Sequence, residues 1–367
     1  MKTIAFYLPQ FHPIPENSNW WNSGFTEWTN VARSRPLFPG HQQPRIPGEL
    51  GFYDLRLAET REEQASLAKK YRIDGFCYYH YWFAGKILLQ RPIEEMLSTG
   101  KPEIDFCLSW ANEGWTANWV GNPNKILMAQ TYPGEEDHRA HLKYLRPFFT
   151  DPRYIRVDER PLFLIHRPFD IPRLREILEI WRKLAKEYLG CDMFLVGVGN
   201  QVEELLSQGF DGVTTHSLHP ALNDYLTRFR KVRQMFMHRV LNRPRWVIPY
   251  QDLMPFMIRD EWKCNNVFPD IFPNWDNSPR LGRQALVIIK SQPDLFAKIF
   301  RQAAEAVRGR SSDRQLVFIK SWNEWAEGNY IEPDLTFGRG YLEAIAGVVE
   351  SIATDPRLRS QKESEYT

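Results

Sequence analysis

The stretch LVFIKSWNEWAEG (residues 316–328) decides the fold, because an apolar run typical of a buried strand ends abruptly in polar and aromatic side chains. The same pattern recurs along the whole chain. Candidate strands lie at 3–8, 74–81, 104–110, 161–166, 193–198, 211–216, 271–275 and 316–322. The seventh run departs from the pattern, because Pro269 and Pro273 lie beside it or within it.

Amphipathic helical patterns separate these runs, near 59–72, 92–99, 137–148, 172–189, 201–208, 291–308 and 340–353. Nearly continuous apolar strands joined by helices indicate a parallel sheet that is covered on both faces. Eight such units predict a closed (β/α)8 TIM barrel rather than an open doubly wound sheet.

No linker-like tract divides the sequence, so we expect a single α/β barrel domain over residues 1–355 with long loops at its C-terminal face. Residues 356–367 are expected to form a C-terminal tail. The stretch 218–266 is too long for a simple connection and predicts an insertion that rims the cleft. Between Tyr225 and Gln251 this insertion has no acidic residue but seven basic ones. They predict either a solvated amphipathic helix or a rim that meets an anionic glycan.

The composition is that of a soluble globular protein with many aromatic residues. Aromatic residues make up 14% of the chain and include 13 Trp, and such rings suit a core, an interface or a cleft that stacks sugars. The net charge of +2 disfavours nucleic acid as a partner. No apolar run approaches the length of a membrane span. The oligomeric state is not indicated.

The N-terminal run MKTIAFYL (1–8) is interrupted by Pro9 and Gln10 too early for a secretory signal. We expect it to be the first strand, and the sequence therefore favours a cytoplasmic location. The four cysteines are widely separated and form no C-x-x-C motif. Cys77 and Cys107 fall in apolar runs, which predicts buried reduced thiols.

Polar and aromatic side chains gather where the predicted strands end. In a (β/α)8 barrel these ends and their loops build the active site. The candidate substrate-binding residues are Tyr7, Gln10, His12, Trp28, Tyr79, His80, Tyr81, Trp110, Asn112, Glu113, Trp115, His166, Asn200, His216, Trp275, Asp276, Asn323, Trp325 and Tyr330. Satisfied polar groups in the core would explain only two or three members of such a set.

Alternation along a strand refines this set. Side chains point to opposite faces in turn, so His80 must face away from Tyr79 and Tyr81, and only one pair can line the barrel mouth. An alternative interpretation is a metal site built from His80, His166 and His216. No short ligand spacing supports it.

Glu324 and Glu327, which follow the eighth strand, are the candidate catalytic residues. Splitting a glycosidic bond needs a proton for the leaving oxygen and a base or nucleophile at the developing positive centre, and paired carboxylates supply both. Two close carboxylates cannot both ionise freely, so one pKa rises. The alternative is that both acids lie in the first turn of a helix, where the helix dipole favours them.

Six segments carry a family resemblance: AFYLPQFHPIPENSNWWNSGFTEWTNV (5–31), DGFCYYHYWF (74–83), LSWANEGWTANW (108–119), PLFLIHRP (161–168), PNWDNSPR (273–280) and SWNEWAEGNYIEPD (321–334). Through them the chain resembles the WbsX family of bacterial polysaccharide-locus proteins, which is related to the family 99 glycoside hydrolases. The resemblance covers nearly the whole chain.

This resemblance implies a retaining glycoside hydrolase that acts on a carbohydrate, with no metal and no organic cofactor. By the resemblance, Glu324 matches the base that acts on the sugar 2-hydroxyl and gives a 1,2-anhydro intermediate. Glu327 matches the acid/base that protonates the departing oxygen and later activates water. The sugar, the linkage and the choice between internal and terminal cleavage are not indicated.

Two other functions stay open. WbsX proteins have been labelled glycosyltransferases, which implies a role in O-antigen or lipopolysaccharide synthesis. Such an enzyme usually has a nucleotide-binding sheet domain and often an Asp-x-Asp motif, and the sequence contains neither that motif nor a Gly-rich turn after a strand. A non-catalytic glycan-binding barrel would bind a glycan without cleaving it.

Overall fold

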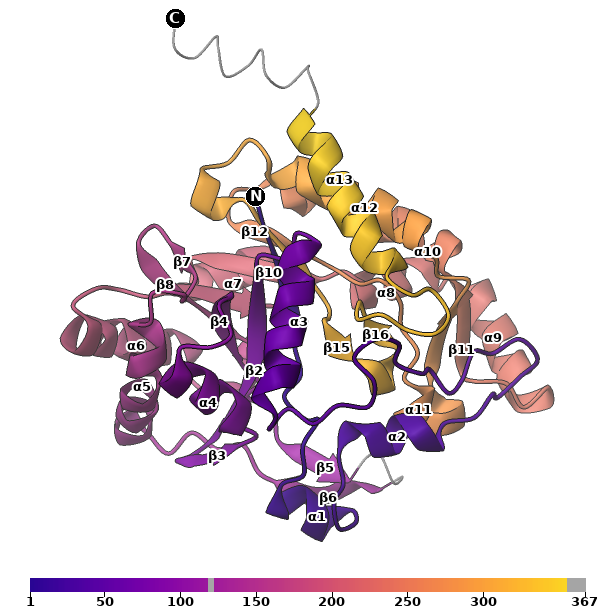
Figure 1. The fold of residues 1–367 in the computed structure, drawn as a ribbon, viewed down its shortest axis with the longest axis horizontal. Coiled ribbons are helices and arrows are strands. Elements are labelled where there is room, and N and C mark those ends of the chain that lie inside the picture. The colour runs from indigo at the N-terminus through magenta and orange to yellow at the C-terminus, as the bar shows by residue number, and fades with distance from the viewer. Residues whose placement is uncertain (118–121, 355–367) are drawn as a thin grey trace, which may run out of the picture.

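The structure is a computed structural model that describes residues 1–117 and 122–354, and its centre is a closed ring of parallel strands (Figure 1). The strands of the ring are β1 (Lys2–Tyr7), β2 (Gly75–Phe83), β4 (Asp105–Trp110), β8 (Arg160–Ile165), β9 (Phe194–Val198), β10 (Gly212–His216), β12 (Val267–Ile271) and β14 (Leu316–Ile319). Neighbours in the ring all pair in parallel, and β1 pairs with both β2 and β14, which closes it. The predicted (β/α)8 TIM barrel is confirmed.

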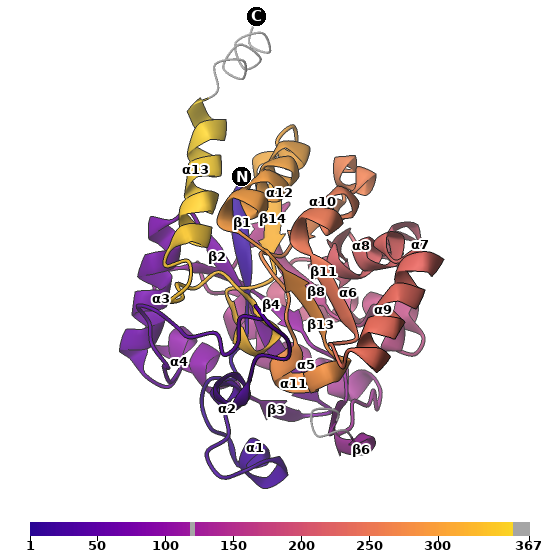
Figure 2. The ribbon, with the colours of Figure 1, turned by 90° about the vertical axis from the view of Figure 1, so that its right-hand side faces the viewer.

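Helices surround the ring on its outer side (Figures 1 and 2). They include α3 (Ala58–Lys70), α4 (Arg91–Thr99), α5 (Glu135–Phe149), α6 (Leu174–Leu189), α7 (Val202–Gln208), α12 (Pro293–Val307) and α13 (Gly340–Thr354), which lie within a few residues of the seven predicted helical patterns. The strands are almost entirely buried, because the barrel interior covers one face and the helices cover the other. Cys77 and Cys107 are buried free thiols, as predicted.

The seventh strand was predicted at 271–275, and this was wrong, because β12 occupies Val267–Ile271. Pro269 lies inside this strand, opposite Thr215 of β10. Proline lacks the N–H that a sheet ladder needs and is scarce in central strands, so the pattern favoured a strand beyond it. The strand tolerates Pro269 because its pairing with β14 begins only at Asp270.

The expected insertion at 218–266 forms α8 (Leu218–Tyr225), α9 (Arg228–Val240), β11 (Trp246–Pro249), α10 (Tyr250–Met257) and a 3-10 turn (Asp260–Lys263). Strand β11 pairs in parallel with β13 (Leu286–Ile289), outside the ring. The expected tail at 356–367 lies outside the described residues. Within the described ranges, no helix is both long enough and apolar enough to cross a lipid bilayer.

Further short elements lie in the loops. Helices α1 (Pro15–Trp20) and α2 (Glu27–Arg33) lie in the first long loop, and β3 (Lys86–Leu88) extends β2 as a hairpin. The others are β5 (Trp115–Ala117), β6 (Asn122–Met128), β7 (Arg156–Val157) and α11 (Ser278–Leu281). The chain after β14 forms β15 (Asn323–Glu324), η6 (Trp325–Glu327) and β16 (Asn329–Tyr330).

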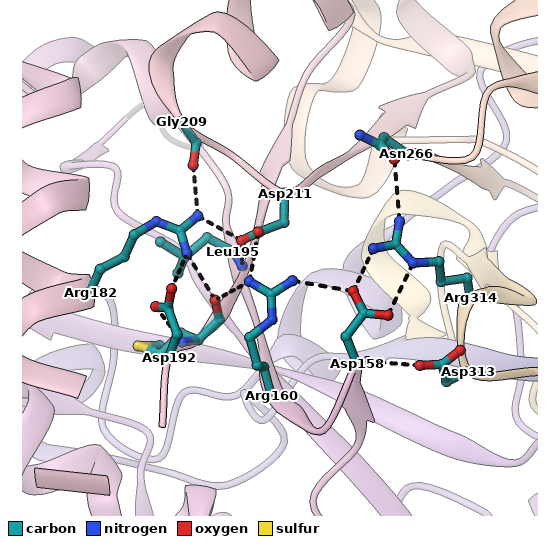
Figure 3. Close-up of polar contacts among 11 residues, drawn as sticks. Asp158, Arg160, Arg182, Asp192, Leu195, Gly209, Asp211, Asn266, Asp313 and Arg314 are labelled. Atoms are coloured by element: carbon teal, nitrogen blue, oxygen red, sulfur yellow. Dashed lines mark hydrogen bonds and ion pairs between the residues drawn. The ribbon is translucent and has the colours of Figure 1, made fainter. Parts of the chain in front are cut away.

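A network of ion pairs joins the N-terminal ends of several barrel strands (Figure 3). The carboxylate of Asp211 accepts hydrogen bonds from Arg160 Nη1 at 2.8 Å and from Arg182 Nη2 at 2.7 Å. Asp158 contacts Arg160 at 3.3 Å and Arg314 at 2.5 Å, which extends the network to the start of β14. These side chains therefore connect helix α6 with the beginnings of strands β8, β9, β10 and β14.

We expect Asp211→Ala to lower the free energy of unfolding by about 2–4 kcal/mol, because two half-buried guanidinium groups lose their shared acceptor. The backbone N–H of Leu195 loses the same carboxylate. Urea unfolding followed by tryptophan fluorescence measures the change. The matched control is Asp260→Ala, which removes an exposed pair with Lys263 and should leave the unfolding midpoint unchanged. Equal effects of the two changes would contradict the prediction.

Candidate active site

A cavity of about 720 Å³ lies at the C-terminal ends of the barrel strands, and residues at or just after the ends of all eight strands line it. The sequence-predicted residues among them are Gln10, Tyr79, Tyr81, Glu113, Trp115, His166, Asn200, Trp275, Glu324 and Glu327. Leu218 and His219, at the start of the insertion, line it too, so the insertion contributes to the rim.

The two candidate catalytic residues follow β14 in a tight reversal of the chain. Glu324 ends β15, and Glu327 ends the 3-10 turn η6 that follows it. The chain then forms β16, which pairs with β15 in antiparallel orientation. Gly328 adopts φ +60°, and an added Cβ atom would lie 2.9 Å from the Cβ of Asp276. Only glycine fits this close approach without strain. The turn brings both glutamates to the same cavity.

Arg280 of α11 links three carboxylates at the cavity floor. Its Nη1 lies 2.6 Å from Glu327, its Nη2 lies 3.8 Å from Glu324, and its Nε donates to Glu27 at 3.0 Å. Glu27 is fully buried. Because buried carboxylates are costly without compensation, Arg280 stabilises the charged forms of the group.

A second cation, Lys320, also lies near Glu324. Its Nζ lies 4.0 Å from Glu324 and 3.2 Å from the hydroxyl of Tyr79. The nearby carboxylates raise the pKa of Lys320 against the effect of its burial. Lys320 therefore stays charged over the neutral range and forms a fixed positive centre in the cavity.

The pKa of Glu324 is raised to about 7, first by burial and then by the negative charge of Glu327. A side-chain hydrogen bond with Glu327 acts in the same direction, whereas Lys320 and Arg280 oppose it. Burial also raises the pKa of Asp270, which lines the same cavity, to about 8. The cavity therefore contains two carboxyl groups that hold or release a proton near neutral pH.

Other predicted residues shape the floor from outside the cavity. The amide of Asn323 accepts from Leu8 N at 2.7 Å and donates to Leu8 O, which ties the segment after β14 to β1. Trp325 stacks on Tyr330, with ring centroids 3.7 Å apart, and donates to Glu332 at 2.6 Å. These contacts fix the backbone that carries both glutamates.

The buried carboxylate of Glu332 collects a set of donors beneath this floor. Gln64 donates to it at 2.7 Å and Tyr53 at 2.9 Å, in addition to Trp325. Trp28 was predicted to bind substrate, but its ring packs against Trp325 and its Nε1 donates to the carbonyl of Tyr53. Glu332 therefore joins the first loop, helix α3 and the segment after β14.

Three more predicted residues hold loops around the cavity. Asp276 accepts from His41 at 2.8 Å and from Gln43 at 2.7 Å, and its N–H donates to the carbonyl of Glu327 at 2.6 Å. Asn112 bonds both the N–H and the carbonyl of Arg167, each at 2.8 Å or less. Tyr7 points away from the cavity and donates to Gln64 at 2.6 Å.

The predicted alternation along β2 is confirmed. Tyr79 and Tyr81 line the cavity, whereas His80 Nε2 lies 2.7 Å from His141 of α5 on the outer face of the strand. Trp110 is also buried on that side, stacked on Trp181. The structure thus places both His80 and Trp110 in the layer between strands and helices.

His12 is buried outside the cavity lining, and its burial lowers the pKa to about 4. The side chain of His216 lies outside the described part of the structure. His80 faces away from His166, so these two do not form a shared metal site. Among the described residues, no three His, Cys, Asp or Glu side chains gather in a way that could hold a metal ion.

Sequence reasoning missed Arg280, Glu27, Lys320 and Asp270 as site residues. Arg280 ends the quoted segment PNWDNSPR, and Lys320 is the first charge after the apolar run of the eighth strand. A cation directly after a buried strand is a signal for the site face. Nothing local marked Glu27 as the partner of Arg280, because 253 positions separate them.

Comparison with known proteins gives relatives over nearly the full chain. The family model described as Glycosyltransferase WbsX matches residues 3–345. Proteins named WxcX from two strains of Xanthomonas campestris pv. campestris are 37% identical over 344 residues, which covers 93% of this chain and 48% of theirs. The chain therefore spans about half the length of these relatives.

Solved structures share the fold. The GH99 endo-alpha-mannosidase from Bacteroides thetaiotaomicron aligns with a TM-score of 0.58 and 16% identity, over 96% of this chain and 97% of that one. A glycoside hydrolase-like protein aligns with the same TM-score and 14% identity, over 95% and 93% of the two chains. At this identity the likeness shows a common barrel architecture. Because the family model matches residues 3–345, the chain belongs to the WbsX family.

Proposed function

We propose that this chain is a glycoside hydrolase that cleaves a polysaccharide or oligosaccharide, with Glu324 and Glu327 as its catalytic carboxylates. The observation that carries the proposal is that Glu324 and Glu327 line one cavity together with the rings of Tyr81, Trp115 and Trp275. The cavity volume falls in the range of small-molecule sites. Aromatic faces beside paired carboxylates suit a sugar ring whose glycosidic bond is broken.

The pair starts with one proton to share. Below about pH 7 that proton lies on Glu324, hydrogen-bonded to Glu327. Its movement to Glu327 leaves one base and one acid, which is the state that a glycosidase needs. The raised pKa also makes ionised Glu324 a stronger base than an ordinary carboxylate.

Two steps follow from the roles that the family 99 resemblance implies. Ionised Glu324 takes the proton of the sugar 2-hydroxyl, whose oxygen attacks the anomeric carbon, while Glu327 gives its proton to the departing oxygen. Water then loses a proton to Glu327 and opens the 1,2-anhydro ring, and Glu324 returns its proton to the 2-oxygen. The configuration at the anomeric carbon is retained.

Arg280 and Lys320 would balance the charges during both steps. Each cation lies within 4.0 Å of a glutamate oxygen, so neither glutamate ionises in an uncompensated apolar pocket. Arg280 also keeps Glu327 oriented through its contact at 2.6 Å.

Glycosyl transfer is the second candidate, because the matching family model is described as a glycosyltransferase. The two functions differ in the donor. Incubation with nucleotide sugars and an acceptor tests transfer, and a screen of bacterial polysaccharides and aryl glycosides, read by mass spectrometry, tests hydrolysis. Product from nucleotide sugars, with no cleavage of any glycoside, would replace the hydrolase proposal.

Glu327→Gln should slow substrates with poor leaving groups by at least about a hundredfold but activated aryl glycosides by less than about tenfold, because activated groups leave without a proton. Glu324→Gln should slow both substrate classes alike, since its base role does not depend on the leaving group. Measurement of kcat/KM for the two classes separates the roles.

The matched control for this pair is Glu305→Gln, an exposed residue of α12 that should retain full activity. Reversed patterns would exchange the two roles. Losses below about tenfold in both variants, equivalent to about 1.4 kcal/mol of barrier, would remove the pair from the chemistry.

The pH profile tests the ionisation of Glu324. Because the pair loses its single shared proton as pH rises through about 7, and the active state needs that proton on Glu327, kcat/KM should fall with pH through about 7. Lys320→Met removes a cation that lowers this pKa, so the limb on which activity falls should move to higher pH, whereas Lys320→Arg should keep it in place. Asp270→Asn should also leave the limb in place. Activity that instead rises with pH through 7 would show that the reaction does not use the shared proton of this pair.

A further inference from the structure

Helix α9 of the insertion exposes its apolar side chains to solvent. Phe229 is 79% exposed, Val232 61%, Phe236 58% and Val240 59%. These residues are three or four positions apart, so they form one continuous stripe along the helix. None of the described residues of α9 is buried. In Figures 1 and 2 the helix lies on the outside of the molecule, beside β11.

The opposite face of α9 attaches to the protein through polar groups. Gln234 donates from Nε2 to the carbonyl of Val247 at 2.8 Å. His238 Nδ1 lies 2.8 Å from the carbonyl of Arg243. The helix is therefore inverted relative to an ordinary surface helix, whose apolar face packs on the core. An exposed apolar stripe of this size marks an interaction site.

Arginines border the stripe on both sides. At 100° per residue, Arg233 falls on one flank and Arg228 and Arg239 fall on the other. The basic residues between Tyr225 and Gln251 are Arg228, Arg230, Lys231, Arg233, Arg239, Arg243 and Arg245, and this stretch has no acidic residue. The whole chain has a net charge of only +2, so the stretch carries +7 and the rest of the chain carries −5.

We propose that α9 docks this protein onto the surface of a bilayer that contains anionic lipids. A basic helix with a large apolar stripe lies in the plane of the interface, with its apolar side chains among the acyl chains and its arginines at the headgroups. The 13-residue helix is too short to span a bilayer. The uneven charge would also orient the protein, because an anionic surface attracts this basic segment and repels the rest of the chain, whose net charge is negative.

Two other partners fit the surface less well. Nucleic acid would satisfy the arginines but would leave the apolar stripe, with both of its valines, in contact with phosphates and water. A second copy of the chain would cover the stripe but would bring two strongly cationic segments together. An anionic lipid surface satisfies both the apolar stripe and the charge.

The location of α9 relates the docking surface to the cavity. Helix α8, which immediately precedes α9, contributes Leu218 and His219 to the cavity lining. After α9, the N–H of Arg245 donates to the carbonyl of Arg283 at 2.8 Å. Arg283 is close in sequence to Arg280 of the cavity. A docked α9 would therefore hold the cavity near the membrane surface.

Co-sedimentation of the full chain with vesicles tests the proposal. Vesicles of phosphatidylcholine with phosphatidylglycerol should bind the protein at least about tenfold more tightly than phosphatidylcholine alone, and added salt should reduce the difference. The double variant Phe229→Ser/Phe236→Ser should lose at least about tenfold of the affinity for mixed vesicles, because its stripe no longer enters the acyl region. Arg233→Gln/Arg239→Gln should lose the preference for anionic vesicles.

Matched controls lie elsewhere on the surface. Leu335→Ser removes an apolar side chain that is 72% exposed, and Arg173→Gln removes an exposed arginine, so neither should change binding. Circular dichroism verifies the fold of each variant. Absence of vesicle binding by the parent chain, or vesicle binding that the α9 variants share in full, would overturn the proposal. A dimer that Phe229→Ser/Phe236→Ser dissociates, without vesicle binding, would assign the stripe to a second copy instead.

Discussion

Closure of the sheet through β1, which pairs with both β2 and β14, is the constraint on which the rest of the molecule depends. A closed parallel ring has no free edge, and it brings eight carboxyl ends to one rim and eight amino ends to the other. The two rims solve different problems. Ion pairs around Asp211 hold the amino ends together, whereas the carboxyl ends surround a cavity with unfavourable buried charge. The stabilising ion pairs and the candidate active site therefore lie at opposite ends of the barrel.

The carboxyl rim concentrates negative charge that burial opposes. Glu27, Glu324 and Glu327 meet there, and Arg280 contacts all three. Burial and the charge of Glu327 outweigh the opposing effect of Lys320 and Arg280, which leaves the pKa of Glu324 at about 7. The buried Glu332 network lies below and fixes the backbone. The cost of these desolvated acids is what makes the site able to exchange protons at neutral pH.

Local patterns in the sequence were enough to predict the barrel and to place both glutamates at its carboxyl rim, because strand periodicity and a short carboxylate spacing are both local properties. The seventh strand was misplaced because proline has a low strand propensity. In the structure, however, β12 includes Pro269, since its pairing with β14 begins only at the next residue. Aromatic residues were less predictable. Trp115 lines the cavity while Trp110 and Trp325 are in the core, and residue type alone does not distinguish a wall from a core ring. The partnership of Arg280 with Glu27 depends on the closed fold and has no local signature.

The basic insertion shows why the net charge of a whole chain conceals the charge of its segments. A net charge of +2 argues against polyanionic partners only if the charge is evenly spread, and here one segment carries +7 while the remainder is acidic. At physiological ionic strength the Debye length is about 8 Å, so a partner responds to the charge of the segment it approaches and not to the total. The same reasoning applies to hydrophobicity. Helix α9 has an ordinary amphipathic sequence, and only its attachment through Gln234 and His238 reveals that the apolar face points outward. Sequence periodicity defines two faces of a helix, but tertiary contacts decide which of them meets the solvent.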